Sequence, residues 1–214
     1  MTYCMSDIHG ELDRFRQMLE TIAFSRSDQL YILGDAIDRG PHGLQVLRQI
    51  MDSPNMTLLM GNHEEMCWNA LQPGCDRNTE RLWKMNGGKQ SFMELTVLRP
   101  PEEREEILRY ISSLPDFLEL TVEGRQFHLV HAMPGESRYR RLWGRPEHDY
   151  VGPWKDRLCV LGHTPTCYLT FNEFEPLHIF HGKGFVDIDC GCGSRSQYRR
   201  LACLRLEDMK EFYV

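Results

Sequence analysis

The sequence predicts an α/β fold whose first half forms a parallel sheet and whose second half is richer in strands. Short apolar runs at 2–5, 30–33 and 56–60 alternate with segments of helical periodicity, an order typical of parallel sheets. Each run is followed within a few residues by glycine, acidic and imidazole side chains. With 214 residues, the chain is long enough for one domain with a sizeable core.

The elements of the first half follow from their periodicity. After the first strand, apolar residues at helical spacing predict a helix over about 11–23. After the second strand, apolar residues between 44 and 51 predict another helix, which ends near Pro54. The third strand at 56–60 completes a strand–helix–strand–helix–strand unit. Because ligands bind at the carboxyl ends of the strands in such sheets, we expect functional groups just after each strand.

The middle of the chain differs from its two flanks. Residues 65–114 are predicted to be a mostly helical insertion into a single domain spanning 1–214, because no linker-like stretch borders them. Strands at 117–122 and 126–130 surround Glu123-Gly124, a two-residue hairpin signal. The other predicted segments are an irregular polar stretch at 134–157 and strands at 159–161, 166–171, 177–180, 185–189 and 201–206.

Composition excludes several classes of protein. The net charge is -6 and the pI about 5.8, so the overall basic charge expected of a nucleic-acid-binding protein is absent. No apolar run approaches the roughly 18 residues of a membrane span. The first residues show no signal peptide, and we therefore expect a cytoplasmic protein whose eight cysteines are free thiols.

Potential metal ligands follow five of the predicted strands. These residues are Asp7 and His9, Asp35 and Asp38, Asn62 and His63, His131, and His163. One such histidine alone is more often a hydrogen-bonded structural residue, but five strand ends are hard to explain in that way. Their oxygen and nitrogen atoms, without a thiolate, suit Mn, Fe or Zn. Two such ions side by side favour phosphate-ester hydrolysis. The other histidines are interpreted as ordinary: His42, His128, His148, His178 and His181.

Five motifs together resemble the phosphoprotein phosphatase family of calcineurin-like metallophosphoesterases. They are Asp-Ile-His-Gly at 7–10, Gly-Asp-Ala-Ile-Asp-Arg-Gly at 34–40, Gly-Asn-His-Glu at 61–64, His131-Ala132, and Gly-His-Thr-Pro at 162–165. The short length and Asn86-Gly87-Gly88 are similar to the compact bacterial and phage lambda phosphatase branch. The resemblance implies a β-sandwich of two mixed sheets flanked by helices. It also implies two divalent metal ions, Mn in the first place and Fe or Zn as alternatives.

The resemblance assigns a role to each of these residues. Asp7, His9 and Asp35 would hold the first metal ion, and Asp35, Asn62, His131 and His163 the second. His63 would be the general acid, paired with Asp38. Arg39 and Arg145 would bind the phosphoryl oxygens, with Arg138, Arg140 and Arg141 as alternatives to Arg145. The mechanism implied requires no catalytic role of Cys190 or Cys192.

The activity implied is hydrolysis of phosphoserine and phosphothreonine, with phosphotyrosine as a further substrate, by direct attack of a metal-bridging water. The partner would be a phosphorylated protein or peptide. The alternative is a dinucleoside tetraphosphate hydrolase, in which Asp often replaces Glu64. A non-catalytic phosphopeptide-binding module is a third class, and it would be favoured by the loss of a ligand or of His63. Neither is lost here.

Overall fold

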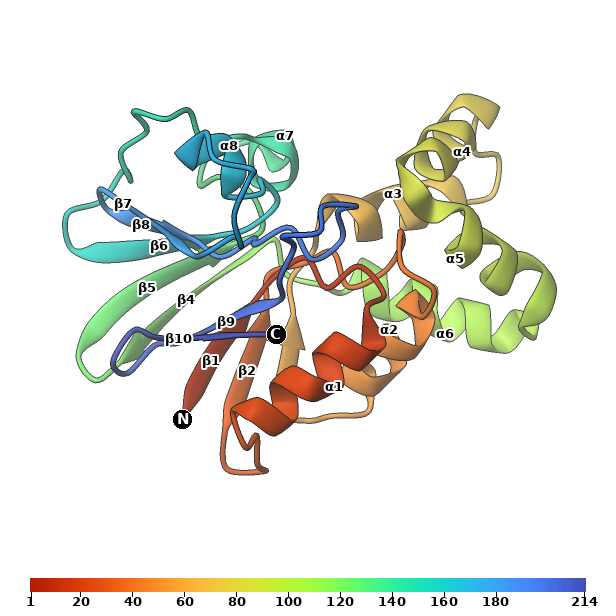
Figure 1. Cartoon of the computed structure of the whole chain (residues 1–214). Coiled ribbons are helices and arrows are strands. Elements are labelled where there is room, and N and C mark those ends of the chain that lie inside the picture. The colour runs from red at the N-terminus through yellow and green to blue at the C-terminus, as the bar shows by residue number, and fades with distance from the viewer.

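The computed structural model describes the whole chain except the side chain of Leu98, and it contains two five-stranded mixed sheets flanked by helices (Figure 1). The first sheet has the order β10-β9-β1-β2-β3. Its strands are β1 Thr2–Met5, β2 Gln29–Ile32, β3 Met56–Leu58, β9 Ala202–Arg205 and β10 Lys210–Tyr213. The three N-terminal strands are parallel, β9 pairs antiparallel with β1, and β10 pairs antiparallel with β9. The predicted parallel unit is therefore confirmed.

The second sheet has the order β4-β5-β6-β8-β7. Its strands are β4 Phe117–Val122, β5 Arg125–Val130, β6 Arg157–Leu161, β7 Phe180–Gly182 and β8 Phe185–Asp187. The central three are parallel and the two edge strands antiparallel. Glu123 and Gly124 connect β4 to β5 with φ of 49° and 76°, the positive values that a tight two-residue hairpin requires. The predicted hairpin is confirmed.

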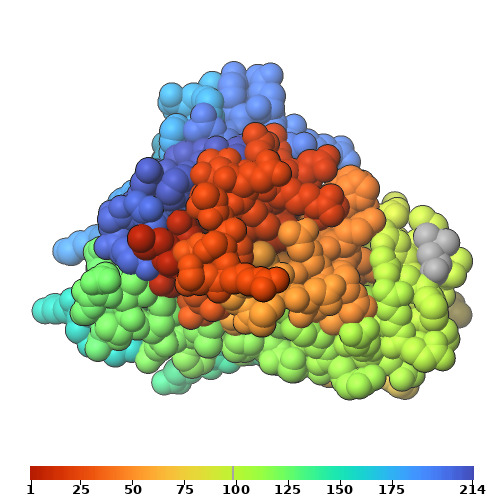
Figure 2. Space-filling view, turned by 90° about the horizontal axis from the view of Figure 1, so that it is seen from below, coloured from red at the N-terminus to blue at the C-terminus, as the bar shows by residue number. Residues whose placement is uncertain are grey.

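Helices lie mainly beside the first sheet. They are α1 Leu12–Thr21, α2 Gly43–Met51, α3 Asn62–Ala70, α4 Arg77–Trp83, α5 Lys89–Met93, α6 Pro101–Ser112, α7 Arg138–Trp143 and α8 Cys167–Thr170, with the π-helical turns η1 Lys84–Gly88 and η2 Glu94–Leu98. Helices α3 to α6 occupy the segment predicted to be mostly helical. From below, this segment (yellow-green) lies on the opposite side of the N-terminal elements from the C-terminal strands (blue) (Figure 2). No helix among the residues described is both long and apolar enough to cross a membrane.

Side chains that alternate between the two faces of each strand divide the core into layers. In β1, Tyr3 and Met5 pack with Phe15 of α1 in one buried cluster, whereas Cys4 points the other way into a cluster shared with Val160 of β6. Successive side chains of a strand face opposite sides of a sheet, so the second cluster lies between the two sheets. A smaller cluster covers the far face of the second sheet. The packing therefore holds the carboxyl ends of both sets of parallel strands in fixed positions.

Some predicted strands are wrong. The strand predicted at 166–171 is instead helix α8, in which the amides of Leu169 and Thr170 donate to Thr166 O. Pro165 precedes this turn, and proline has no N–H to donate to a sheet. The strand predicted at 177–180 begins only at Phe180, as β7.

Two elements were not predicted. The stretch expected to be irregular, 134–157, contains α7, whose N-cap Ser137 accepts a hydrogen bond from Arg140 N. Edge strand β10 was missed because its residues are only partly buried and show no apolar run.

Candidate metal centre

The loops that follow β1, β2, β3, β5 and β6 bring the predicted metal ligands and the His63–Asp38 pair together. Six of the predicted site residues have a positive φ: Asp7 53°, His9 48°, Asp35 55°, Asp38 69°, Arg39 61° and His163 67°. Non-glycine residues rarely adopt this conformation, which costs about 1–3 kcal/mol for each residue. Backbone strain of this kind collects at functional sites, and here it marks the predicted one.

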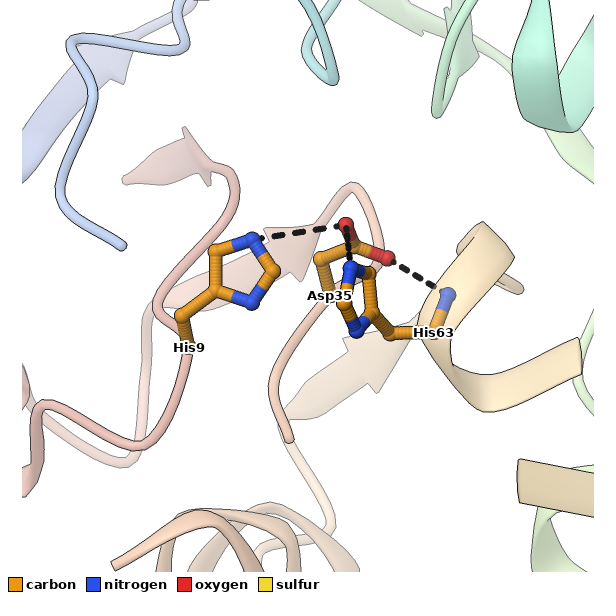
Figure 3. A group of neighbouring side chains, drawn as sticks. All are labelled: His9, Asp35 and His63. Carbon is orange, nitrogen blue, oxygen red and sulfur yellow. Dashed lines mark hydrogen bonds and ion pairs between the residues drawn. The ribbon is translucent and has the colours of Figure 1, made fainter. Parts of the chain in front are cut away.

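Asp35 lies at the centre and presents its two oxygens to different histidines. Its Oδ2 is 3.5 Å from His9 Nε2 and 3.9 Å from His63 Nε2 (Figure 3), whereas its Oδ1 is 3.5 Å from His131 Nε2. The side chain is 1% exposed, and burial raises its pKa well above the usual value. A nearby cation would favour the carboxylate form, and two oxygens facing apart can contact two cations.

Two histidines are held by backbone carbonyls. His9 Nδ1 lies 3.1 Å from Ile37 O, and His131 Nδ1 lies 2.6 Å from Leu33 O. An Nδ1–H donating to a carbonyl leaves Nε2 with its lone pair, and this arrangement is typical of metal-ligating histidines. His9 Nε2 is buried without a hydrogen-bond partner among the described residues, as a ligand atom would be before it binds a cation.

In the second set of predicted ligands, too, the facing oxygen and nitrogen atoms carry lone pairs and not protons. Asn62 Oδ1 lies 3.0 Å from His131 Nε2, so two lone pairs face each other when this ring is neutral. His163 Nε2 is buried without a partner among the described residues. Burial, together with the nearby positive charge of Arg145, lowers the pKa of His163 to about 2. The neutral ring is the form that binds metal, so these residues fit a cation.

Two groups of ligand atoms stand close enough to hold metal ions. The atoms within 4.8 Å of one another belong to His9, Asp35 and His63 in one group and to Asp35, His131 and His163 in the other. Asp7 Oδ1 lies 3.8 Å from His9 Nε2, and its Oδ2 accepts hydrogen bonds from Ser6 Oγ and His163 N. The first group thus includes His63, and Asp7, the predicted ligand, lies beside it.

The sulfur atoms nearby do not act as ligands in this arrangement. Cys190 belongs to the core between the sheets and Cys192 to the core on the helix side, so their thiols point in opposite directions. Burial raises the pKa of Cys192 to about 12, and its Sγ contacts Ile8 O at 3.6 Å. All eight cysteines are free, as predicted.

His63 and Asp38 form a buried pair beside the two ligand groups. His63 Nδ1 lies 2.7 Å from Asp38 Oδ2, and both side chains are fully buried. Trp83 Nε1 donates to the same Asp38 oxygen at 2.6 Å. On the other side of the ring, Arg39 Nη2 lies 3.1 Å from His63 Nε2. Sequence reasoning missed Trp83, for which the only signal was its position three residues before Asn86-Gly87-Gly88.

This glycine pair lets the helical segment approach the site closely. Gly87 has φ 109°, and a Cβ there would lie 2.8 Å from Arg39 Cγ. The Arg39 amide donates to Gly87 O at 3.1 Å. A Cβ on Gly88 would lie 2.2 Å from Trp83 Nε1. Larger residues at either position would push Arg39 or Trp83 away from the His63–Asp38 pair.

Glu64 was also missed as a site residue. In the sequence it served only to distinguish a protein phosphatase from a dinucleoside tetraphosphate hydrolase. The carboxylate is fully buried. Its Oε2 accepts from the amides of Asp35 and Gly61 at 2.8 and 3.1 Å, and its Oε1 accepts from Ala36 N at 2.9 Å and more weakly from Ile37 N. Glu64 thus joins the loops after β2 and β3, which is a structural role independent of substrate.

The predicted alternatives to Arg145 are engaged elsewhere. Arg141 pairs with Asp116 at 2.7 Å, and Arg138 reaches the same carboxylate at 3.4 Å. Arg140 donates its Nε–H to a backbone carbonyl at 3.0 Å. Arg145 is exposed, and none of the hydrogen bonds or ion pairs between described residues includes it. It is the arginine of this group that is available to an incoming anion.

The family follows from comparison with known proteins. Residues 2–189 match the calcineurin-like phosphoesterase family. The chain belongs to this family. The likeness to solved structures agrees with the fold: a putative diadenosine tetraphosphatase superposes with a TM-score of 0.61 at 16% identity, over 100% of this chain and 92% of the other. The predicted pair of mixed sheets flanked by helices is confirmed.

Relatives of two kinds match this chain. Serine/threonine-protein phosphatase 2 of Escherichia coli K12 is 33% identical over 144 residues, which are 67% of this chain and 62% of that protein. The symmetrical bis(5'-nucleosyl)-tetraphosphatase of Acidovorax ebreus TPSY is 47% identical over 132 residues, 61% of this chain and 43% of that enzyme. This chain therefore matches less than two thirds of the length of either relative. Both names describe hydrolysis of a bond to phosphorus, whereas the substrates they give are different.

Proposed function

We propose that this phosphoesterase is a protein phosphatase that uses two divalent metal ions to hydrolyse phosphoserine and phosphothreonine, with phosphotyrosine as a further substrate. One observation carries the proposal: the two oxygens of Asp35 face separate histidine groups, and the His63–Asp38 pair lies directly beside them. The phosphatase of Escherichia coli also matches a larger share of both chains than the Acidovorax tetraphosphatase does.

The residues that would hold the ions are those predicted from the sequence. Asp7, His9 and Asp35 would bind one, and Asp35, Asn62, His131 and His163 the other. The ions, for which Mn is proposed and Fe or Zn are alternatives, would supply a water of lowered pKa and neutralise charge on the phosphoryl group. The fit depends on the buried, partnerless Nε2 atoms of His9 and His163 and on the absence of a nearby thiolate.

Arg39, Arg145 and His63 would handle the substrate itself. The guanidinium groups offer paired donors to phosphoryl oxygens and stabilise charge that develops there. His63 would protonate the departing serine oxygen from Nε2, and Asp38 holds the ring by Nδ1. Because Arg39 Nη2 occupies the space next to Nε2 in the structure, we expect phosphate to draw Arg39 away and leave Nε2 free for the leaving group.

Hydrolysis of dinucleoside tetraphosphates is the second candidate. It is favoured by the 47% identity to the Acidovorax ebreus enzyme. Glu64 does not discriminate between the two, because its carboxylate is occupied by backbone amides.

A substrate panel in the presence of Mn tests the proposal. We expect kcat/KM for a phosphoserine peptide to exceed that for diadenosine tetraphosphate, and the reverse order would favour the second candidate. The matched variant is His63→Asn, which should reduce hydrolysis of phosphoserine by roughly 10²–10⁴-fold. The loss should be much smaller on p-nitrophenyl phosphate, whose leaving group hardly needs a proton. Equal losses on both substrates would contradict the general-acid role.

A further inference from the structure

A groove of about 450 Å³ opens beside Arg39, within the size range of ligand-binding pockets. Residues 85–87 of η1 line one side and residues 193–195, in the loop between β8 and β9, line the other, together with Arg39, Gly40, Glu11 and Arg199. In Figure 1 this loop (blue) crosses the middle of the molecule close to the loops that follow β1 and β2. Because Arg39 itself lines the groove, the groove opens beside the proposed phosphate site.

Both walls of the groove are attached directly to site residues. On one side the Arg39 amide donates to Gly87 O at 3.1 Å. On the other side Gly193 packs so closely on His9 that a Cβ there would lie 2.1 Å from His9 Cδ2. A group in the groove would thus lie next to a phosphate held by Arg39.

The groove carries an excess of positive charge in an acidic chain. Arg199 is occupied, because it donates to Glu11 at 2.9 Å and to Ser194 O at 3.0 Å, which fixes the loop. Arg195 on that loop is exposed and takes part in no hydrogen bond or ion pair between described residues. With Arg39 assigned to the phosphate, the groove still contains Arg195 and Arg199 against Glu11, a net charge of about +1, although the chain as a whole carries -6.

We propose that this groove binds an acidic side chain of the substrate, so that the preferred substrates are phosphopeptides with Asp or Glu next to the phosphorylated residue. The inference rests on the proposed phosphatase function. Arg195 would pair with the carboxylate through its planar donors. An extended peptide advances roughly 3.3–3.6 Å per residue, so an acidic residue one to three positions from the phosphoserine can reach the groove while Arg39 holds the phosphate.

Two phosphoserine peptides that differ only in Glu or Gln at the flanking positions test the inference. We expect wild type to hydrolyse the Glu peptide with a kcat/KM about two- to fivefold higher, as for one solvent-accessible charge-assisted contact. The preference should fall with added salt. In Arg195→Gln the ratio between the two peptides should approach one. The control Arg26→Gln removes the same charge from the exposed loop between α1 and β2 and should keep the wild-type ratio.

Three other outcomes are distinguishable, and each would reject one part of the proposal. Equal hydrolysis of both peptides by wild type would reject the groove assignment and leave the phosphatase function standing. An unchanged ratio in Arg195→Gln would reject Arg195 as the contact. Hydrolysis of diadenosine tetraphosphate but of neither peptide would reject the phosphatase function, and with it an acidic peptide as the occupant.

Discussion

Trp83 Nε1 donates to Asp38 Oδ2 at 2.6 Å, and this is the oxygen that His63 Nδ1 contacts at 2.7 Å. The tryptophan belongs to α4 in the helical segment, whereas Asp38 and His63 follow strands β2 and β3. The second donor holds the carboxylate in one orientation and so fixes the histidine ring. The helical segment therefore contributes to the geometry of the site and not only to its surroundings.

We expect Trp83→Phe to lower kcat for a phosphoserine peptide about tenfold, because a hydrogen bond to a charged group is worth about 1.5 kcal/mol or more. The aromatic ring remains, so the packing on Gly88 is largely kept. If Trp83 acts through Asp38 and His63, the loss on p-nitrophenyl phosphate should be much smaller. The measurement is kcat on both substrates together with the thermal midpoint of unfolding.

Trp68→Phe is the matched control, since Trp68 lines a surface hollow with α6. It should leave the ratio of the two activities at the wild-type value. A Trp83→Phe enzyme that loses both activities equally would indicate a general structural defect instead.

Arg39→Ala should reduce kcat/KM for phosphopeptides by a hundredfold or more, because one charge-assisted donor to a developing oxyanion is worth on the order of 3 kcal/mol. Arg145→Ala should give a similar loss. Metal content should stay at the wild-type level in both variants. Arg141→Ala removes an arginine that is paired with Asp116, and it should have a much smaller effect on kcat/KM. Wild-type kinetics in Arg39→Ala would disprove the phosphate contact.

Glu64→Gln should destabilise the fold by about 1–3 kcal/mol, because the amide NH₂ cannot accept the backbone hydrogen bonds that one carboxylate oxygen now accepts. Urea unfolding measures the loss. Glu65→Gln is the control, since Glu65 is partly exposed and its ion pair with Arg138 is long at 3.4 Å. The amide oxygen of Gln can still accept the hydrogen bond that Trp143 Nε1 donates at 3.0 Å, so we expect a change below about 1 kcal/mol. Equal stabilities of the two variants would show that the Glu64 contacts are not important.

Alkylation should report the state of the cysteines. Burial raises the pKa of Cys192 to about 12 and that of Cys190 well above its usual value, so both stay protonated at pH 8, and the thiolate is the reactive form. Only Cys75 and Cys167 are partly exposed. Iodoacetamide should therefore modify at most these two thiols in the folded protein, as counted by mass spectrometry. Rapid modification of Cys190 or Cys192 would show that the site opens in solution.

The parts of the fold that periodicity determines were predicted well. The three parallel strands of the first sheet and the hairpin at Glu123-Gly124 follow from short-range patterns. The predicted strand at 166–171 failed because an apolar run of this length fits a helical turn equally well, and Pro165 decided between them. Edge strand β10 depends on pairing with β9, and that contact cannot be read from its own residues.

The site was predicted from residues that carry chemistry at strand ends. Asp35 and the histidines stand out because each follows an apolar run. Trp83 and Glu64 do not, because their importance comes from contacts across the fold: an indole 45 positions from Asp38 and a carboxylate that receives amides 27 to 29 positions away. Such long-range contacts depend on tertiary packing. The one local contact of Glu64, with the amide of Gly61, is a helix-capping interaction and does not reveal them.

The metal content of the Mn-loaded protein tests the central claim most directly, with hydrolysis of a phosphoserine peptide measured on the same samples. We expect about two ions per chain in wild type, loss of activity on chelation and its return with Mn. Asp35→Asn should lose most of both ions, since both ligand groups share Asp35, whereas His63→Asn should retain them. One ion per chain in wild type, or full activity after the metal has been removed, would contradict the dinuclear site.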